Sequence, residues 1–166
     1  MKNKKIFKSI LIVIGIMITF VLTLIVFLNA NMLYNDLILN SFSKQLYECK
    51  IPEETIIIEK HKLCGKLYGN GNGTDFAAII LLQTNFETTK KQVEEYYSSL
   101  NFNPAKGKKH TVEIIVESVE QPDFINGYIV NIPLKFQTIL KNKDYQYYAV
   151  VIFDGGYSAG FDLRSN

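Results

Sequence analysis

The residues of this chain that could carry out nucleophilic or redox chemistry are two cysteines and two histidines. A bridge between Cys49 and Cys64 would close a loop of about 15 residues and stabilise the fold by about 3 kcal/mol in an oxidising compartment. The other interpretation is two buried thiols that pack as small hydrophobic side chains. The sequence leaves both open. The spacing is not C-x-x-C, so it does not predict a thioredoxin-like redox site.

Cys64 could also act as a nucleophile if the fold brought His61 or His110 to it as a base. No local motif favours that pairing, and a packed cysteine is the simpler expectation. A zinc site needs three or four ligands, and His61 with Cys64 supplies two. The sequence therefore predicts no catalytic residue, no metal site and no cofactor.

Two glycine-containing runs could suggest ligand loops, and both are better explained as turns. Gly69–Gly73 is followed by strand-forming residues, whereas a phosphate-binding loop leads directly into a helix. Asp154-Gly155-Gly156 with Asp162 does not follow the spacing of an EF-hand calcium loop. We expect a hairpin turn at the first run and a plain turn at the second.

One basic cluster lies far from the N-terminus and could contact an anionic surface. Its members are Lys106, Lys108, Lys109 and His110. Each charge near an anionic membrane contributes about 1 kcal/mol to attraction. The alternative is an ordinary solvated loop.

The chain that must position these residues has an apolar stretch near its N-terminus, Ile6–Leu28. It meets the roughly 20 residues needed to cross a bilayer, and an α-helix is the form that satisfies its backbone there. Lys2, Lys4, Lys5 and Lys8 precede it, which predicts a cytoplasmic N-terminus. A signal peptide has a shorter apolar region and a small-x-small cleavage site, so we expect an uncleaved anchor. The predicted parts are a basic tail (1–8), a membrane helix (9–28), a juxtamembrane stalk helix (29–50) and an extracytoplasmic domain (51–166).

Composition limits what that domain can be. About 120 residues are enough for a single core. The net charge of +2 belongs largely to the N-terminal lysines, so the domain is close to neutral and nucleic acid is not an expected partner.

Hydrophobic patterning predicts an antiparallel sheet with one packed helix, an α+β domain. An apolar stripe over Met32–Tyr47, comprising Leu33, Leu37, Ile38, Phe42, Leu46 and Tyr47, predicts the stalk helix, which could pack on the domain, lie on lipid or pair with a partner helix. Thr89 and Gln92 predict a capping box at the start of the packed helix. The predicted strands are Thr55–Glu59, Leu63–Tyr68, Asp75–Gln83, Thr111–Glu117, Tyr128–Gln137, Tyr145–Phe153 and a short one at Phe161–Leu163.

The segment Cys64–Gly73, with the strand and the Glu-Tyr-Tyr helix after it, resembles a group of small membrane-anchored or secreted proteins of Gram-positive bacteria. In that group a G-K-L-x-G-N-G-N-G turn leads into an apolar strand and a helix. The resemblance implies a location and an order of elements, and no activity.

The sequence as a whole favours a non-enzymatic, single-pass membrane protein whose exported α+β domain binds an envelope protein or anionic polymer. Two alternatives remain open. One is a membrane-tethered thiol enzyme or hydrolase that uses Cys64 and a histidine. The other is an immunity or accessory subunit that acts through its membrane segment.

Overall fold

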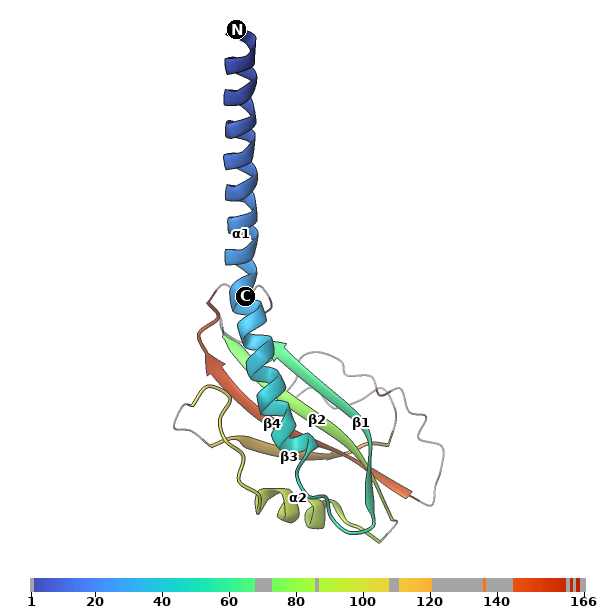
Figure 1. Cartoon of the computed structure of the whole chain (residues 1–166). Coiled ribbons are helices and arrows are strands. Elements are labelled where there is room, and N and C mark those ends of the chain that lie inside the picture. Colours follow the sequence, from blue (N-terminus) through green and yellow to red (C-terminus); the bar gives the residue numbers. More distant parts are fainter. Residues whose placement is uncertain are drawn as a thin grey trace.

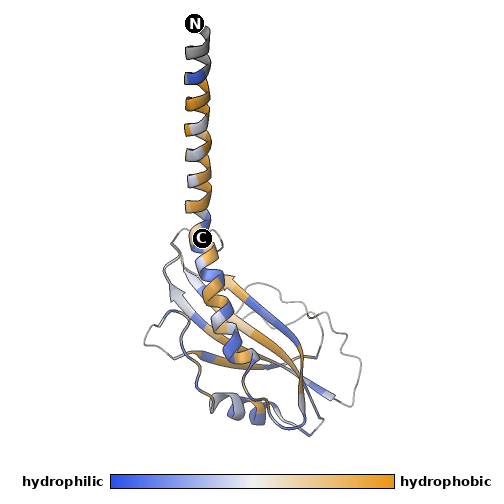
Figure 2. Ribbon diagram, in the orientation of Figure 1, coloured by the Kyte–Doolittle hydropathy of each residue, from blue (hydrophilic) through white to orange (hydrophobic). Residues whose placement is uncertain are grey.

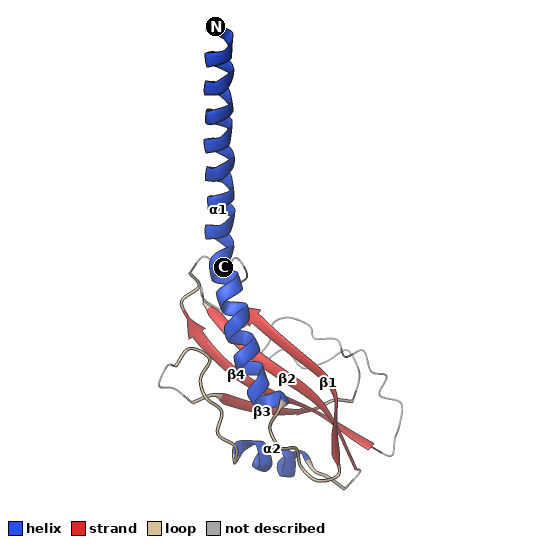
Figure 3. Ribbon diagram, in the orientation of Figure 1, coloured by secondary structure: helices blue, strands red, loops and turns tan. Residues whose placement is uncertain are grey.

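A computed structural model describes residues 2–67, 73–85, 87–107, 111–120, 136, 145–160, 162 and 164. A long N-terminal helix projects from a domain that contains a sheet, a second helix and the last turns of the long helix itself (Figures 1 and 3). This is the predicted α+β class. The elements in chain order are α1 Lys2–Tyr47, β1 Thr55–Gly65, β2 Thr74–Asn85, α2 Lys90–Ser98, β3 Glu113–Ser118 and β4 Tyr145–Tyr157.

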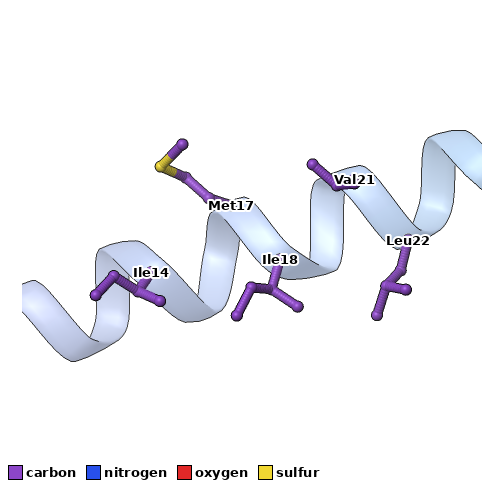
Figure 4. A pocket seen from close by; sticks show the side chains of 5 residues that line it. All are labelled: Ile14, Met17, Ile18, Val21 and Leu22. Carbon is purple, nitrogen blue, oxygen red and sulfur yellow. The ribbon is translucent and has the colours of Figure 1, made fainter.

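Helix α1 is one continuous helix that includes the predicted membrane helix and the predicted juxtamembrane helix as far as Tyr47, three residues short of its predicted end. Its part from Ile10 on is long and apolar enough to cross a membrane. Figure 2 shows this apolar part projecting beyond the domain. Its large apolar side chains between Ile10 and Phe27 are about half exposed or more. Figure 4 shows five of them pointing outward from the helix: Ile14, Met17, Ile18, Val21 and Leu22.

The four described strands form one antiparallel sheet in the order β1-β2-β4-β3. The central strands β2 and β4 are the longest, and β2 is buried along nearly its whole length. This confirms Asp75–Gln83 as a central strand, since a strand covered on both faces is apolar on both.

Two expectations about strand boundaries were wrong. Thr55–Glu59 and the start of the next predicted strand belong to one strand, β1, which runs through His61 and Lys62 with a register shift between Ile57 and Glu59. Asp154-Gly155-Gly156 lies within β4 and is not a turn. There the pairing with β2 shifts between Thr74 and Phe76, and Gly156 takes a φ of +78°, so these glycines accommodate a β-bulge.

The last turns of α1 and the whole of α2 pack on the same face of the sheet. Their buried side chains form one cluster with alternate residues of β2 and β4, and its members include Leu39, Phe42, Leu46, Val93, Tyr97, Phe76, Ile80 and Val150. The stalk helix therefore packs on the domain through part of its predicted stripe. Leu33 and Leu37 of that stripe remain 60% and 68% exposed.

The capping box predicted at the start of α2 is confirmed. Thr89 Oγ1 accepts from the amide of Gln92, and the Gln92 side chain accepts from the amide of Thr89. The helix then presents Val93 and Tyr97 to the sheet, as the spacing of its apolar residues predicts.

The opposite face of the sheet carries a second apolar cluster, which includes Leu67, Ala77, Ile79, Leu81, Val119, Phe136 and Val151. Phe136 is the described residue of the predicted strand Tyr128–Gln137, and the rest of that strand lies outside the described residues. The same holds for most of Gly69–Gly73 and for Phe161 and Leu163 of the short predicted strand.

Candidate functional site

Helix α1 and the chain after β4 are joined by a group of four polar residues, Asn35, Asp36, Asp162 and Arg164, called the Arg164 cluster below. The guanidinium of Arg164 donates from Nε to Asp162 Oδ1 at 2.9 Å and from Nη2 to Asp162 Oδ2 at 2.7 Å. Its Nη1 donates to Asp36 Oδ1 at 2.6 Å. Asn35 Nδ2 donates to Asp162 Oδ2 at 2.8 Å. One cation therefore links two carboxylates that are far apart in sequence.

Asp162 is fully buried, so its charge depends on these donors. The hydrogen bonds from Arg164 lower the pKa of Asp162 to about 2, against a smaller opposing effect of burial. The same hydrogen bonds raise the pKa of Arg164. Both groups therefore stay charged at neutral pH.

Gly65 allows the chain after β4 to come this close. Its φ is +141°, and a Cβ built on it would lie 2.6 Å from the carbonyl oxygen of Arg164. That carbonyl accepts from the amide of Lys66 at 2.8 Å. A side chain at position 65 would displace this contact, which explains why glycine is needed at the end of β1.

An open cleft of about 450 Å³ lies beside the Arg164 cluster. Helix α1 contributes Asp36, Leu39 and Asn40, the end of β1 contributes Lys62, Leu63 and Cys64, and Arg164 completes the lining. Lys62 Nζ donates to Asn40 Oδ1. The volume falls within the range of small-ligand sites, and the lining combines ammonium, guanidinium and carboxylate groups with a thiol.

The structure does not bring Cys64 and His61 together. Cys64 packs with the cluster under the helices, whereas His61 contacts Phe136 on the other face of the sheet. His61 Nε2 instead lies 3.0 Å from Glu59 Oε2. Burial raises the pKa of the Cys64 thiol to about 12, which disfavours the nucleophilic thiolate. His110, the other candidate base, lies outside the described residues.

Cys49 and Cys64 are both free thiols, and both are partly buried against the cluster under the helices. Cys49 Sγ donates to Leu46 O at 3.2 Å at the end of α1, and Cys64 lies beside Asp36. Leu46, beside Cys49, and Asp36, beside Cys64, are ten helical residues apart on α1, a distance of about 15 Å. A disulfide needs Cα atoms within about 7 Å, so this arrangement does not permit the bridge.

Lys106, the described member of the predicted basic cluster, lies against aromatic rings. Its Nζ is 5.7 Å from the ring centre of Tyr34 on α1, 5.2 Å from that of Phe76 and 5.4 Å from that of Tyr157. These cation–π contacts attach the loop after α2 to α1 and to the sheet. Lys108, Lys109 and His110 lie outside the described residues.

The aspartates of the glycine-containing run bind backbone amides. Asp154 Oδ2 accepts from Ala105 N at 2.6 Å, and Asp75 accepts from Leu67 N at 3.1 Å and from Gly156 N at 2.9 Å. Asp162 belongs to the Arg164 cluster and not to this group. The part of the chain that the structure describes contains no group of three metal-ligating side chains.

Asn35, Asp36 and Arg164 were not singled out by sequence reasoning. The position of Asn35 could have predicted a buried polar contact. It lies one helical turn before Leu39, on the side of α1 that faces the domain. Arg164 lies two residues from its main partner, Asp162, but its contact with Asp36 spans 128 positions and has no local signal.

Fold and cluster together define an α+β domain fixed to the end of a long apolar helix. Comparison with protein-family models, with curated proteins and with solved structures finds no match for this chain.

Proposed function

We propose that this chain is a single-pass membrane protein of the cell envelope that works as a non-enzymatic binding or accessory module. Its N-terminus would be cytoplasmic and its α+β domain extracytoplasmic. The observation that carries the proposal is the division of α1 into two parts. The first has its apolar side chains exposed, and the last turns are buried in the domain core.

The exposure of the apolar side chains in the first part of α1 supports a membrane location for that part. Apolar side chains such as Phe20 and Val26 are 68% and 69% exposed, which is unfavourable in water and favourable in lipid. Lys8, which is exposed, marks the start of this part. The sequence resemblance to membrane-anchored Gram-positive proteins supports the same location.

A binding role rests on the chemistry of the cleft. Cys64 lines it with its pKa raised to about 12, and His61 lies on the other face of the sheet. The groups that face the cleft are suited to hydrogen bonding and ion pairing with a small polar ligand or a partner's side chains.

A contact with anionic headgroups at the predicted basic cluster is the second part of this proposal. Lys106 lies against Tyr34, and Tyr34 follows Leu28 by about 9 Å along the helix. Headgroup layers are about 5–8 Å thick, so Lys106 would lie close to them. Phosphatidylglycerol vesicles should therefore bind the chain more tightly than phosphatidylcholine vesicles, and Lys108→Gln with Lys109→Gln should weaken that preference.

The orientation can be tested in intact cells that produce the full chain with a C-terminal epitope. External protease should remove the epitope, and alkaline carbonate should leave the N-terminal fragment in the membrane. Replacing Lys2, Lys4, Lys5 and Lys8 by Gln should reduce the fraction oriented this way. The matched control, Lys90→Gln with Lys91→Gln, removes two charges of α2, whose side chains are 42% and 81% exposed, and should leave orientation unchanged. A protected epitope would refute the orientation, and a chain released by carbonate would refute the anchor.

A further inference from the structure

The Arg164 cluster carries one negative charge that its own cation does not neutralise. Two carboxylates share a single guanidinium, which donates four hydrogen bonds to Asp162, Asp36 and the carbonyl oxygen of Met32. Asp162 is fully buried, and both of its oxygens accept hydrogen bonds. The Asp36 side chain is 43% exposed, and no residue that the structure describes donates to its Oδ2 atom. The uncompensated charge therefore lies at Asp36, in the lining of the cleft.

The ammonium group that β1 contributes to the cleft also lacks a charged partner. Lys62 is exposed, and its Nζ donates to the neutral side chain of Asn40 rather than to Asp36. Among the described residues, the ion pairs do not include Lys62. An ammonium group has three donors, so two remain for a ligand. The cleft therefore presents two opposite charges that do not pair with each other.

The separation of these charges indicates the size of the ligand that would pair with both. Asp36 and Asn40, which holds Lys62, are one helical turn apart on α1, about 6 Å along the axis. Hydrogen bonds between charged groups are about 2.8 Å long, and an ammonium and a carboxylate on one carbon atom, with such a bond at each end, span a distance of this size. Leu39 and Cys64 also line the cleft, so the carbon atoms of the ligand would meet less polar side chains.

We propose that this cleft binds a free α-amino acid, whose ammonium donates to Asp36 and whose carboxylate accepts from Lys62. The inference deepens the proposed function, because it rests on the binding role proposed for the cleft. A zwitterionic lipid headgroup carries similar charges, but its distance from the cleft disfavours it. Asp36 lies eight residues past Leu28, about 12 Å, whereas the headgroup layer is about 5–8 Å thick. A ligand free in solution is therefore favoured.

The test uses the full chain in detergent micelles and follows binding by isothermal titration calorimetry. Glycine, alanine and leucine are titrated separately, and at least one of them should bind saturably below about 10 mM. Two analogues of the tightest ligand are then compared with it. The amide keeps the ammonium without the carboxylate, and the deamino acid keeps the carboxylate without the ammonium. Each should bind at least about tenfold more weakly, because each leaves one charge of the cleft unpaired.

Two conservative variants connect each charge of the ligand to one residue. Lys62→Gln should weaken binding of the amino acid at least about tenfold and remove the difference between the amino acid and its amide. Asp36→Asn keeps an acceptor for Arg164, so it should preserve the cluster. It should weaken binding by a similar factor and remove the difference between the amino acid and its deamino analogue. The matched controls Lys91→Gln and Glu95→Gln each remove one charge of an exposed ion pair of α2 and should leave binding unchanged.

No saturable binding of the three amino acids up to about 10 mM would overturn the proposal, and so would binding that both variants leave unchanged. Binding to phosphatidylethanolamine vesicles alone would also overturn it, in favour of a lipid headgroup. The thermal unfolding of Lys62→Gln should match that of the natural chain, because the altered side chain is exposed, so that loss of binding is not loss of the fold. Conversion of the bound amino acid to another compound, detected by mass spectrometry, would support the ligand class and contradict the proposed non-enzymatic role.

Discussion

Arg164 binds both carboxylate oxygens of the buried Asp162, with Nε–Oδ1 and Nη2–Oδ2 distances of 2.9 and 2.7 Å. Paired hydrogen bonds of this kind are specific to the planar guanidinium and are stronger than neutral ones. Since Arg164 also donates to Asp36 on α1, the relationship fixes the chain after β4 against the helix.

Arg164→Met should lower the free energy of unfolding by about 3 kcal/mol, because it leaves the buried Asp162 carboxylate without its main partner. Denaturant unfolding of the full chain in micelles would measure this. Asp162→Asn combined with Arg164→Met should recover part of the loss, since no unpaired charge is then buried. The control is Lys91→Met, which removes an ion pair whose side chains are 81% and 66% exposed, and it should cost less than about 0.5 kcal/mol.

Acid should weaken the fold through the same carboxyl. The pKa of Asp162 is about 2 in the folded chain, below its ordinary 3.8, so the unfolded chain takes up the proton first as pH falls. The stability from this group is complete above about pH 4 and is lost as pH approaches 2, by about 2 kcal/mol in total. Asp162→Asn should lack this part of the acid dependence. An identical acid profile in the variant would show that Asp162 contributes nothing.

The two faces of α1 beside the domain should respond differently to truncation of a large side chain. Phe42→Ala removes a side chain that is 1% exposed and should destabilise the domain by about 3–5 kcal/mol. Leu37→Ala alters one that is 68% exposed and should cost less than about 0.5 kcal/mol. Equal effects would contradict the packing of one face of α1 on the domain while the other face stays exposed.

Two buried tyrosines should respond oppositely to replacement by Phe. The Tyr97 hydroxyl is buried and has no hydrogen-bond partner among the residues that the structure describes, so Tyr97→Phe should stabilise the fold by up to about 1 kcal/mol. Tyr148 Oη donates to Thr88 O at 2.9 Å, so Tyr148→Phe should destabilise it by about 1 kcal/mol. Denaturant midpoints of the two variants would distinguish them.

Native Cys64 should react slowly with iodoacetamide near neutral pH. Burial raises its pKa from 9.0 to about 12, which lowers the thiolate fraction. We expect alkylation at least about a hundredfold slower than in the denatured chain, measured by peptide mass spectrometry. Fast native alkylation at Cys64 would instead favour the thiol-enzyme alternative.

The sequence predicted those elements whose local pattern agrees with their final environment. The central strand β2 could be predicted because it is apolar on both faces. The capping box of Thr89 and Gln92 could be predicted because its two residues are three positions apart. The continuity of β1 was not predicted, because the polar residues His61 and Lys62 suggested a turn between two strands. An edge strand tolerates such polar residues. Asp154 with two glycines suggested a turn, whereas pairing with β2 draws that segment into β4.

The Arg164 cluster depends on contacts that local patterns do not encode. Asn35 meets Asp162 across 127 positions, and the approach needs a positive φ at Gly65. The separation of His61 from Cys64 also became clear only from the fold. Both residues belong to the continuous strand β1, and the alternation of side chains along that strand places them on opposite faces of the sheet.

Helix α1 runs without a break from its apolar part into the domain core, so a tilt of the apolar part would tilt the domain with it. In a membrane, the domain's orientation would then follow the tilt of the helix, which depends on bilayer thickness. A thinner bilayer would tip the whole domain toward the surface and change which of its edges a neighbouring molecule can reach.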